Sequence, residues 1–319
     1  MSDKAELAVI GFHREYVIDE LGREFTLHMV DAPDRVADQL GPAAARVRGV
    51  VTSPMVGVSA ALMDALPKLE IAALFGVGLE RADLEHARKR EVVVTTTPVL
   101  YEDVADLAMV LAIDVSRRVS ESDRWVRAGK WPGGGFPLGR RFSGKRAGIL
   151  GMGRIGRMLA GRLAAFDMEI AYYDPKPAPD VSYRACPSGV ELARESDFLF
   201  LCAAGGPGGG HIVGAEMLAA LGPEGVFVNV ARGWLVDEPA LVDAVVTGKI
   251  GGAGLDVFEH EPKLPRALLK MPNVVLTPHL GSAVIDVREK MANIVVDNIL
   301  AILDGRKPPN CVNPEVLPA

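Results

Sequence analysis

The sequence has few cysteines and no long apolar segment. Only three of its 319 residues are cysteines, and Cys186, Cys202 and Cys311 lie far apart without a CxxC pair. This pattern argues against a disulfide framework and against a zinc knuckle. No stretch reaches the roughly 18 apolar residues of a membrane span, and residues 1–12 lack the cationic start and apolar core of a signal peptide. We therefore expect a cytoplasmic protein with reduced thiols.

An excess of basic charge is also missing. Lysine and arginine number 35 against 41 aspartates and glutamates, so the net charge is -6 at pH 7, and the basic residues are scattered. A nucleic-acid or membrane partner is therefore not expected. The composition that remains, 49% hydrophobic and 24% charged, is that of an ordinary globular protein. A chain of 319 residues is long for a single core, which predicts two domains.

Short apolar runs alternate with helix-like segments in two series along the chain. The first series ends near residue 98, and the second extends from about residue 146 to 278. This alternation predicts two α/β domains, each a parallel sheet with a Rossmann-like or flavodoxin-like arrangement, with a cleft between them. Residues 101–120 and 282–303 have helical periodicity, and we expect them to connect the domains.

The strongest local motif is a GxGxxG pattern formed by Gly151, Gly153 and Gly156. It follows an apolar run and opens a helical one, and Asp174 ends the next apolar run. In this setting the glycines let the backbone approach a pyrophosphate, and the helix N-terminus supplies free N–H donors. Asp174 suits the ribose hydroxyls of NAD and would repel the 2′-phosphate of NADP. Lys176 could offset part of that repulsion, so NADP is the alternative cofactor, and a tight turn that binds nothing is the structural alternative.

The position of this motif assigns a role to each domain. Residues 99–283 are predicted to form the dinucleotide-binding Rossmann domain. Residues 1–98, completed by 284–319, are predicted to form the substrate-binding (catalytic) domain.

Three polar segments each follow a predicted strand of the second domain, and we expect them to meet at the carboxyl edge of its sheet. The first holds Arg232, a two-pronged donor for a carboxylate or carbonyl, and the last holds His279, a proton donor near neutral pH. The middle segment, GGAGLDVFEHEP at residues 251–262, offers a carboxylate that can orient the histidine. A cofactor, a cation and an acid together predict hydride transfer to a 2-keto acid. The alternatives are a structural histidine and a capping or interface arginine.

These motifs make the chain resemble the D-isomer-specific 2-hydroxyacid dehydrogenases over nearly its whole length. The matching segments are LFGVGLERADLEHARKREVVVTTTP (74–98), VADLA (104–108), NVARG, DVFEHEP and TPHLGSA. The reductases of glyoxylate, hydroxypyruvate and hydroxyphenylpyruvate are the most similar subgroup, through RAGKW (127–131) and GGAGLDVFEHEP. The glycine-rich segment 205–211 departs from the polar turn usual in the family, which leaves its contact with the cofactor open.

The resemblance implies a catalytic set of Arg232, Glu261 and His279 and no metal. It also implies that Arg232 and the backbone of Gly76, Val77 and Gly78 hold the substrate carboxylate, and that the protein is a homodimer. The implied cofactor contacts are Val104, Gly151, Gly153, Arg154, Ile155, Gly156, Asp174, Ala203, Val230, Ala231, Arg232, Asp256, His279 and Gly281.

The function predicted from these features is the reduction of a small 2-keto acid, of the glyoxylate or hydroxypyruvate type, to the D-2-hydroxy acid with NADH. One alternative is a reductase of hydroxyphenylpyruvate or another bulky 2-keto acid. A second alternative, from another class, is a non-enzymatic scaffold that senses NAD(H). Trp131 is expected either in the core or at a dimer contact.

Overall fold

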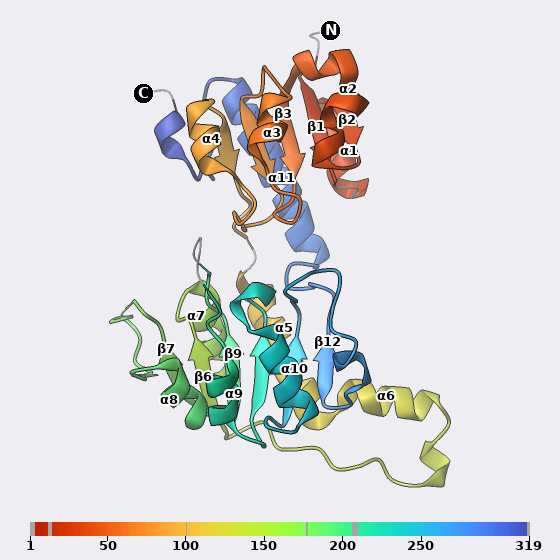
Figure 1. Ribbon diagram of the computed structural model, residues 1–319, viewed down its shortest axis with the longest axis vertical. Coiled ribbons are helices and arrows are strands. Elements are labelled where there is room, and N and C mark those ends of the chain that lie inside the picture. Colours follow the sequence, from red (N-terminus) through yellow and green to blue (C-terminus); the bar gives the residue numbers. More distant parts are fainter. Residues whose placement is uncertain (1–3, 12–14, 100, 177, 206–209, 318–319) are drawn as a thin grey trace. The chain divides into compact units, whose positions relative to one another are not determined.

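Two α/β units make up the computed structural model, which describes residues 4–11, 15–99, 101–176, 178–205 and 210–317 (Figure 1). Unit 1 comprises residues 1–99 and 284–319, and unit 2 comprises residues 100–283. Most of the glycine-rich segment 205–211 therefore lies outside the described residues.

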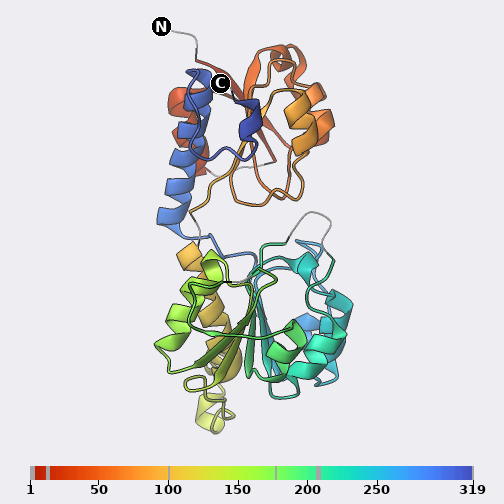
Figure 2. The same ribbon diagram turned by 90° about the vertical axis from the view of Figure 1, so that its left-hand side faces the viewer.

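Unit 1 is built on a five-stranded parallel sheet in the order β2-β1-β3-β4-β5. Figure 2 shows α1 and α11 on one face of this sheet and α3 and α4 on the other. Because both faces are covered, β4 is apolar and buried along its length, and β3 is buried except at Arg48. The strands are β1 (Glu6–Ile10), β2 (Thr26–Val30), β3 (Val47–Thr52), β4 (Ile71–Leu74) and β5 (Val93–Thr95), and the helices are α1 (Glu15–Glu24), α2 (Val36–Leu40), α3 (Ala60–Asp64), α4 (Leu84–Lys89) and α11 (Ile285–Leu303).

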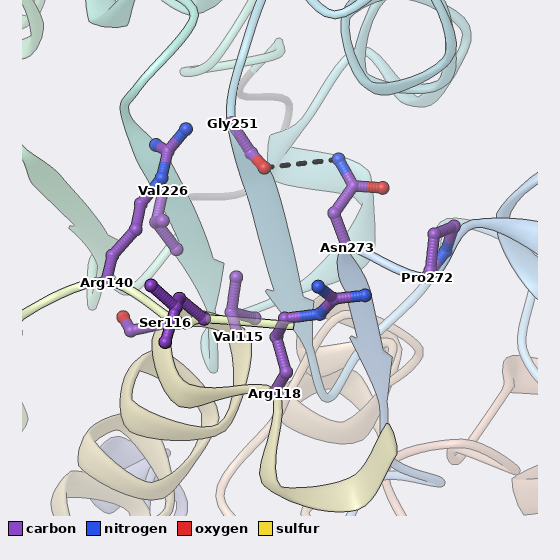
Figure 3. A pocket seen from close by; sticks show the side chains of 10 residues that line it. Val115, Ser116, Arg118, Arg140, Val226, Gly251, Pro272 and Asn273 are labelled. Carbon is purple, nitrogen blue, oxygen red and sulfur yellow. Dashed lines mark hydrogen bonds between the residues drawn. The ribbon is translucent and has the colours of Figure 1, made fainter. Parts of the chain in front are cut away.

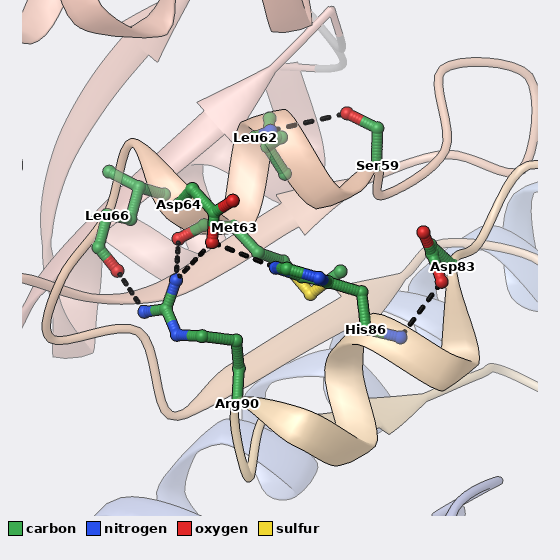
Figure 4. A network of polar contacts seen from close by, with 8 residues as sticks. All are labelled: Ser59, Leu62, Met63, Asp64, Leu66, Asp83, His86 and Arg90. Atoms are coloured by element: carbon green, nitrogen blue, oxygen red, sulfur yellow. Dashed lines mark hydrogen bonds and ion pairs between the residues drawn. The ribbon is translucent and has the colours of Figure 1, made fainter.

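A polar network fastens α3 to the end of α4 in unit 1 (Figure 4). The Asp64 carboxylate lies 2.8 Å from His86 Nε2 and accepts a 2.9 Å hydrogen bond from Arg90 Nη1. Arg90 also donates to the carbonyl oxygens of Met63 and Leu66. The bond with His86, followed by that with Arg90, lowers the pKa of Asp64. His86 thus has a structural role between two helices.

Unit 2 is built on a seven-stranded parallel sheet in the order β12-β11-β10-β9-β6-β7-β8. Its strand order reverses direction between β6 and β9, which is the point where doubly wound sheets bind ligands. Helices α5 and α7 cover one face, and α8, α9 and α10 cover the other (Figure 2). The strands are β6 (Arg146–Leu150), β7 (Glu169–Tyr173), β8 (Arg184–Ala185), β9 (Phe198–Leu201), β10 (Val226–Asn229), β11 (Gly252–Leu255) and β12 (Val274–Leu276), and the helices are α5 (Tyr101–Arg117), α6 (Val119–Arg127), α7 (Arg154–Ala164), α8 (Gly189–Arg194), α9 (Ala215–Leu221) and α10 (Glu238–Val246).

The two parallel-sheet α/β units confirm the predicted fold class, but one predicted helix is wrong in its extent. Helical periodicity over residues 101–120 suggested a single helix, whereas α5 ends at Arg117 and α6 begins at Val119. Arg118 between them has a left-handed backbone, with φ 55°. The buried Asp114 carboxylate accepts hydrogen bonds from the backbone N–H and the hydroxyl of Ser120, so it caps the new helix from within the old one.

Among the described residues, no helix combines the length and the apolar character that crossing a membrane requires.

Candidate active site

The three polar segments predicted to converge follow three neighbouring strands of unit 2. Arg232 comes after β10, Asp256 directly follows β11, and His279 comes after β12, while the sheet order is β12-β11-β10. Because the strands are parallel, their carboxyl ends lie at one edge of the sheet. At Gly233 the backbone approaches Phe258 so closely that an added Cβ would lie 1.9 Å from the Phe258 carbonyl carbon. The structure therefore brings the first and middle segments into direct contact.

His279 and Glu261 form a hydrogen-bonded pair at this edge. His279 Nδ1 lies 2.8 Å from Glu261 Oε2, and the second carboxylate oxygen of Glu261 accepts a 2.9 Å bond from the Phe258 N–H. Burial opposes ionisation of Glu261, but the bonds from His279 and Phe258 and the charge of Arg232 together lower its pKa. An ionised Glu261 accepts a hydrogen bond from the Nδ1–H of His279, so Nε2 of His279 is the nitrogen that can exchange a proton with a ligand.

Asp256 holds the backbone of the turn that carries His279. Its carboxylate accepts hydrogen bonds from the Thr277 hydroxyl at 2.6 Å, the Leu280 N–H at 2.7 Å and the Gly281 N–H at 3.0 Å. The Asp256 carbonyl oxygen accepts a fourth bond, from the His279 N–H at 2.9 Å. These bonds fix a turn in which His279 has a left-handed backbone with φ 55°. Thr277 was not among the predicted site residues, and the signal that the sequence offers for it is its position two residues before His279 in TPHLGSA.

Burial raises the pKa of Asp256, and the three hydrogen bonds to the carboxylate only partly oppose that effect. The side chain is 1% exposed, and its two oxygens are already bonded within the protein. In this structure Asp256 thus serves the His279 turn, in addition to the expected place beside a cofactor.

Arg232 lies at the exit of β10, in a turn organised by a buried asparagine. Asn229 Oδ1 accepts from the Ala231 N–H at 3.0 Å, and Asn229 Nδ2 donates to the Arg232 carbonyl oxygen at 3.1 Å. Arg232 Nη1 donates to the Ala231 carbonyl oxygen at 2.8 Å. The half-buried guanidinium is close enough to Glu261 for its charge to lower the pKa of that carboxyl. An arginine so placed can bind a carboxylate or polarise a carbonyl next to the His279 pair.

The GxGxxG loop links β6 to α7, and its three glycines lie in different local surroundings. Gly151 has φ +95°, and a Cβ there would lie 2.6 Å from Ala203 Cα. At Gly156 a Cβ would lie 2.2 Å from the Gly151 carbonyl oxygen, which any side chain would push away from α7. Gly153 faces open space, with no atom within 4 Å of a built Cβ, and it caps α7 without a side-chain hydrogen bond. A close-packed turn with bare N–H donors at the helix start fits the diphosphate of a dinucleotide.

Asp174 directly follows β7 and lies beside this loop. Its Oδ2 accepts a 2.8 Å hydrogen bond from the Met152 N–H within the loop, and its Oδ1 accepts a 2.8 Å bond from the Lys176 N–H. Lys176 itself is exposed. The neighbouring Arg157 donates through both terminal nitrogens to Asp180, and that bidentate pairing lowers the pKa of Asp180. The carboxylate of Asp174 is therefore held in place by the backbone rather than by an ion pair.

The other predicted cofactor contacts gather around the same edge of unit 2. A Cβ on Gly281 would lie 3.2 Å from Val104 Cγ2 and 3.5 Å from Asp256 Oδ2, so these three residues are neighbours. Val230 and Ala231 are buried at the β10 exit, and Ile155 is half-buried at the start of α7. Arg154 contacts the Tyr101 ring, a partner that the sequence analysis did not anticipate.

The predicted substrate loop belongs to unit 1 and follows the carboxyl end of β4. Gly76 has φ +153°, and a Cβ on it would lie 2.6 Å from Pro54 Cγ, so only glycine fits this close approach. The Gly76 carbonyl oxygen accepts a 2.9 Å bond from the Thr97 N–H. Val77 is 38% exposed, whereas Gly76 and Gly78 on either side of it are buried.

A cavity of about 210 Å³ in unit 2 lies away from these residues (Figure 3). Its lining includes Val226 at the start of β10, Gly251 just before β11 and Asn273 just before β12, with Arg118 and Arg140 beside them. These positions mark the amino edge of the sheet, opposite to the edge that holds Arg232 and His279. Over the described ranges, no group of three or more histidine, cysteine, aspartate or glutamate side chains is arranged to hold a metal ion.

Comparison with known proteins matches residues 109–281 to the model of the D-isomer specific 2-hydroxyacid dehydrogenase, NAD binding domain. The chain is 46% identical over 292 residues to a hydroxyphenylpyruvate reductase of Plectranthus scutellarioides, covering 91% of this chain and 93% of that protein. It is 41% identical over 302 residues to a 2-ketogluconate reductase of Gluconobacter oxydans (strain 621H), covering 94% and 96%. Among solved structures, an NADPH-dependent glyoxylate/hydroxypyruvate reductase of Sinorhizobium meliloti in complex with NADP and malonate superposes with a TM-score of 0.90 at 38% identity, over 99% of both chains.

Proposed function

The chain belongs to the D-isomer-specific 2-hydroxyacid dehydrogenases, and on that premise we propose that it reduces glyoxylate or hydroxypyruvate to the D-2-hydroxy acid with NADH. The observation that carries this proposal is the Glu261–His279 pair, 2.8 Å apart, beside Arg232 at the sheet edge that also bears the dinucleotide loop. In this proposal those residues bind the carboxylate and donate to the keto oxygen, the two groups that all 2-keto acids share.

The cofactor would be held by the backbone of the Gly151–Gly156 loop and by Asp174, and when bound it supplies the hydride. The Arg232 guanidinium binds the substrate carboxylate and polarises the keto oxygen. The backbone N–H groups of Val77 and Gly78 are proposed as further donors to the carboxylate, whereas the predicted Gly76 N–H already donates to the Leu74 carbonyl oxygen at 2.9 Å. Protonated His279 donates its Nε2 proton to the keto oxygen as negative charge develops there. Glu261 accepts a hydrogen bond from the Nδ1–H of His279 before and after this proton transfer. The neutral ring left afterwards therefore carries its proton on Nδ1 and keeps its orientation.

We propose NAD over NADP because Asp174 presents a fixed carboxylate at the end of β7. Both of its oxygens accept backbone hydrogen bonds, which keep the side chain beside the loop. Two ribose hydroxyls can donate to such a carboxylate, whereas a 2′-phosphate would bring like charges together. The similarity to an NADPH-dependent reductase of Sinorhizobium meliloti makes NADP the competing cofactor, with the exposed Lys176 as its possible partner.

A panel of 2-keto acids run with both reduced cofactors tests the proposal. We expect turnover of glyoxylate and hydroxypyruvate, with kcat/KM higher for NADH than for NADPH. A preference for NADPH would overturn the Asp174 argument, and a preference for hydroxyphenylpyruvate or 2-ketogluconate would overturn the small-substrate assignment. NADH binding without turnover of any 2-keto acid would instead favour the scaffold that senses NAD(H).

We further propose that the protein is a homodimer formed through an exposed arm of unit 2. The arm, residues 119–140, includes α6 and projects from the rest of the unit (Figure 1). Four large apolar side chains are exposed on it: Val119 at 51%, Val126 at 45%, Trp131 at 67% and Leu138 at 94%. The exposure of Trp131 excludes the core alternative for this residue. Several exposed large apolar side chains on one projecting segment indicate a protein interface, and we propose a second copy of the chain as the occupant because most soluble oligomers are homo-oligomers.

We also propose a cytoplasmic location, based on the thiols. The three cysteines are free, and two of them, Cys186 and Cys202, are buried. Burial raises the pKa of the Cys202 thiol to about 12, which keeps it unreactive. Free, inert thiols of this kind are usual in a reducing compartment.

A further inference from the structure

Arg154 is the first residue of α7 and comes directly after Gly153 of the dinucleotide loop. Its guanidinium lies over the ring of Tyr101, with Cζ 4.9 Å from the ring centroid, and its Nη1 donates to the Tyr101 hydroxyl oxygen. Tyr101 is half-buried at the start of α5, and Arg154 is exposed. A ring face and a hydroxyl thus fix an exposed arginine at the mouth of the loop.

The partner of Arg154 differs from the partners of the other arginines of the same helix. Arg157 is paired with the carboxylate of Asp180, and Arg162 with that of Asp106. For Arg154, the described residues provide no carboxylate partner, and its observed contacts are with the neutral phenol of Tyr101. An aromatic face orients a cation without neutralising it, so the charge stays available to an anion.

We propose that Tyr101 is a cofactor-positioning residue, which holds the Arg154 guanidinium beside Gly153 so that it pairs with the diphosphate of the bound dinucleotide. This inference rests on the proposed use of a nicotinamide dinucleotide. The donors of Arg154 that are not bonded to Tyr101 form the charged hydrogen bonds to phosphate oxygens.

Tyr101 contributes by restricting a side chain that would otherwise be free. An exposed arginine samples many rotamers, and a ligand that binds it must order them. Stacking on Tyr101 selects one arrangement before the cofactor arrives. The effect is one on binding, so it changes cofactor affinity and KM for NADH while leaving kcat close to its original value.

The test is a titration of the full chain with NADH in the absence of substrate, followed by NADH fluorescence. Replacing Tyr101 with leucine removes both the ring and the hydroxyl, and we expect the Kd for NADH to rise about 5- to 10-fold. Tyr101→Phe keeps the ring face and is expected to raise Kd about 2- to 3-fold. In an Arg154→Gln background, Tyr101→Leu should cause no further loss, because Tyr101 acts through Arg154.

Asp106→Asn is the matched control, because it breaks the neighbouring ion pair between α5 and α7 without touching the Tyr101–Arg154 contact. We expect its Kd for NADH to equal that of the original chain, and far-UV circular dichroism establishes that each variant is folded. The proposal is overturned if Tyr101→Leu binds NADH normally, if Asp106→Asn weakens binding equally, or if the loss persists in full in the Arg154→Gln background.

These outcomes are separate from those of the proposed function. If the binding pattern holds but no 2-keto acid is reduced, the positioning role of Tyr101 stands and the proposed reaction fails. If 2-keto acids are reduced and Tyr101→Leu has no effect on NADH affinity, the reaction stands and the positioning role fails.

Discussion

At the scale of single residues, two carboxylates from one short segment orient the candidate acid His279 in different ways. Glu261 contacts the imidazole ring at Nδ1, whereas Asp256 binds the backbone N–H groups on the C-terminal side of the histidine. One fixes the tautomer and direction of the ring, and the other fixes the left-handed turn that carries it. Loss of either carboxylate would therefore displace the imidazole of the candidate acid His279.

The ionised state of Glu261 leads to a prediction about stability and pH. Its folded-state pKa lies below the usual 4.5 of a glutamate, so it stabilises the fold at higher pH. That stabilisation is fully present above the unfolded value and is lost as pH falls through the lowered folded value. We expect Glu261→Gln to be less stable than the original chain near neutral pH, with the difference shrinking once the pH drops below about 4.5.

Urea denaturation of both proteins at a series of pH values measures this difference. The matched control is Glu259→Gln, a neighbouring glutamate for which we assign no bond to His279, and its effect should not follow the same pH course. A difference for Glu261→Gln that stays constant from neutral to acidic pH would show that Glu261 is not held ionised by its partners.

Some of these residue roles could be predicted from the sequence and some could not. The proximity of Glu261 and His279 could be anticipated, because each follows a strand and parallel strands end at one edge. The hydrogen bonds that Asp256 accepts from the Leu280 and Gly281 N–H groups could not be predicted. The sequence does not distinguish an acid that faces a cofactor from one that binds a backbone turn. Likewise nothing in the spacing of Tyr101 and Arg154 indicates that helix packing brings them together.

At the scale of elements, the loop before α7 shows why glycine occurs at these positions. Gly156 and Gly151 are in backbone contact, whereas Gly161, one turn farther along α7, is exposed and has no atom within 4 Å of a built Cβ. A glycine-to-alanine substitution is therefore expected to have opposite effects on stability at these two positions of α7.

We predict that Gly156→Ala destabilises the protein by about 1–3 kcal/mol, because its Cβ would lie 2.2 Å from the Gly151 carbonyl oxygen. The displaced loop should also bind NADH more weakly. Gly161→Ala is the control, and it is expected to stabilise the protein by about 0.5–1 kcal/mol through helix propensity, with unchanged NADH affinity. Thermal unfolding and NADH titration measure both quantities. If Gly156→Ala were as stable as Gly161→Ala, the close packing described for the loop would be incorrect.

Element boundaries were the least predictable part of the fold. Apolar runs located the strands well, because strands buried on both faces need continuous apolar sequence. The break between α5 and α6 was missed because the periodicity of apolar residues continues past it. Local interactions end α5. The Asp114 carboxylate accepts hydrogen bonds from the N–H and hydroxyl of Ser120, and the backbone is left-handed at Arg118.

At the scale of the whole molecule, the proposed arm contact predicts a dimer that a single charge can disrupt. Leu138 is 94% exposed on the arm, and Leu269, 62% exposed elsewhere in unit 2, provides a control of the same residue type. We expect Leu138→Glu to shift the protein from dimer to monomer in light scattering after size-exclusion chromatography, because a buried unpaired carboxylate opposes association. Leu269→Glu should remain a dimer. A monomeric original chain, or a dimer unaffected by Leu138→Glu, would contradict the proposed interface.

The fold class of both units could be predicted because two independent signals agree, alternating apolar and helical segments and a GxGxxG motif placed after a strand. The reaction follows from the convergence of three strand ends, whereas the substrate side chain does not. The carboxylate and the keto oxygen are common to every 2-keto acid, so the residues proposed to bind them carry no information about the remainder of the substrate.

The measurement that tests the central claim most directly compares His279→Ala with the original chain. Turnover of hydroxypyruvate by NADH is followed across a range of pH, and the Kd for NADH is determined for both proteins. If His279 supplies the proton, kcat falls by about 10²–10⁴-fold and NADH affinity is unchanged. Near-normal turnover by His279→Ala over the whole pH range would contradict the assignment of His279 as the acid.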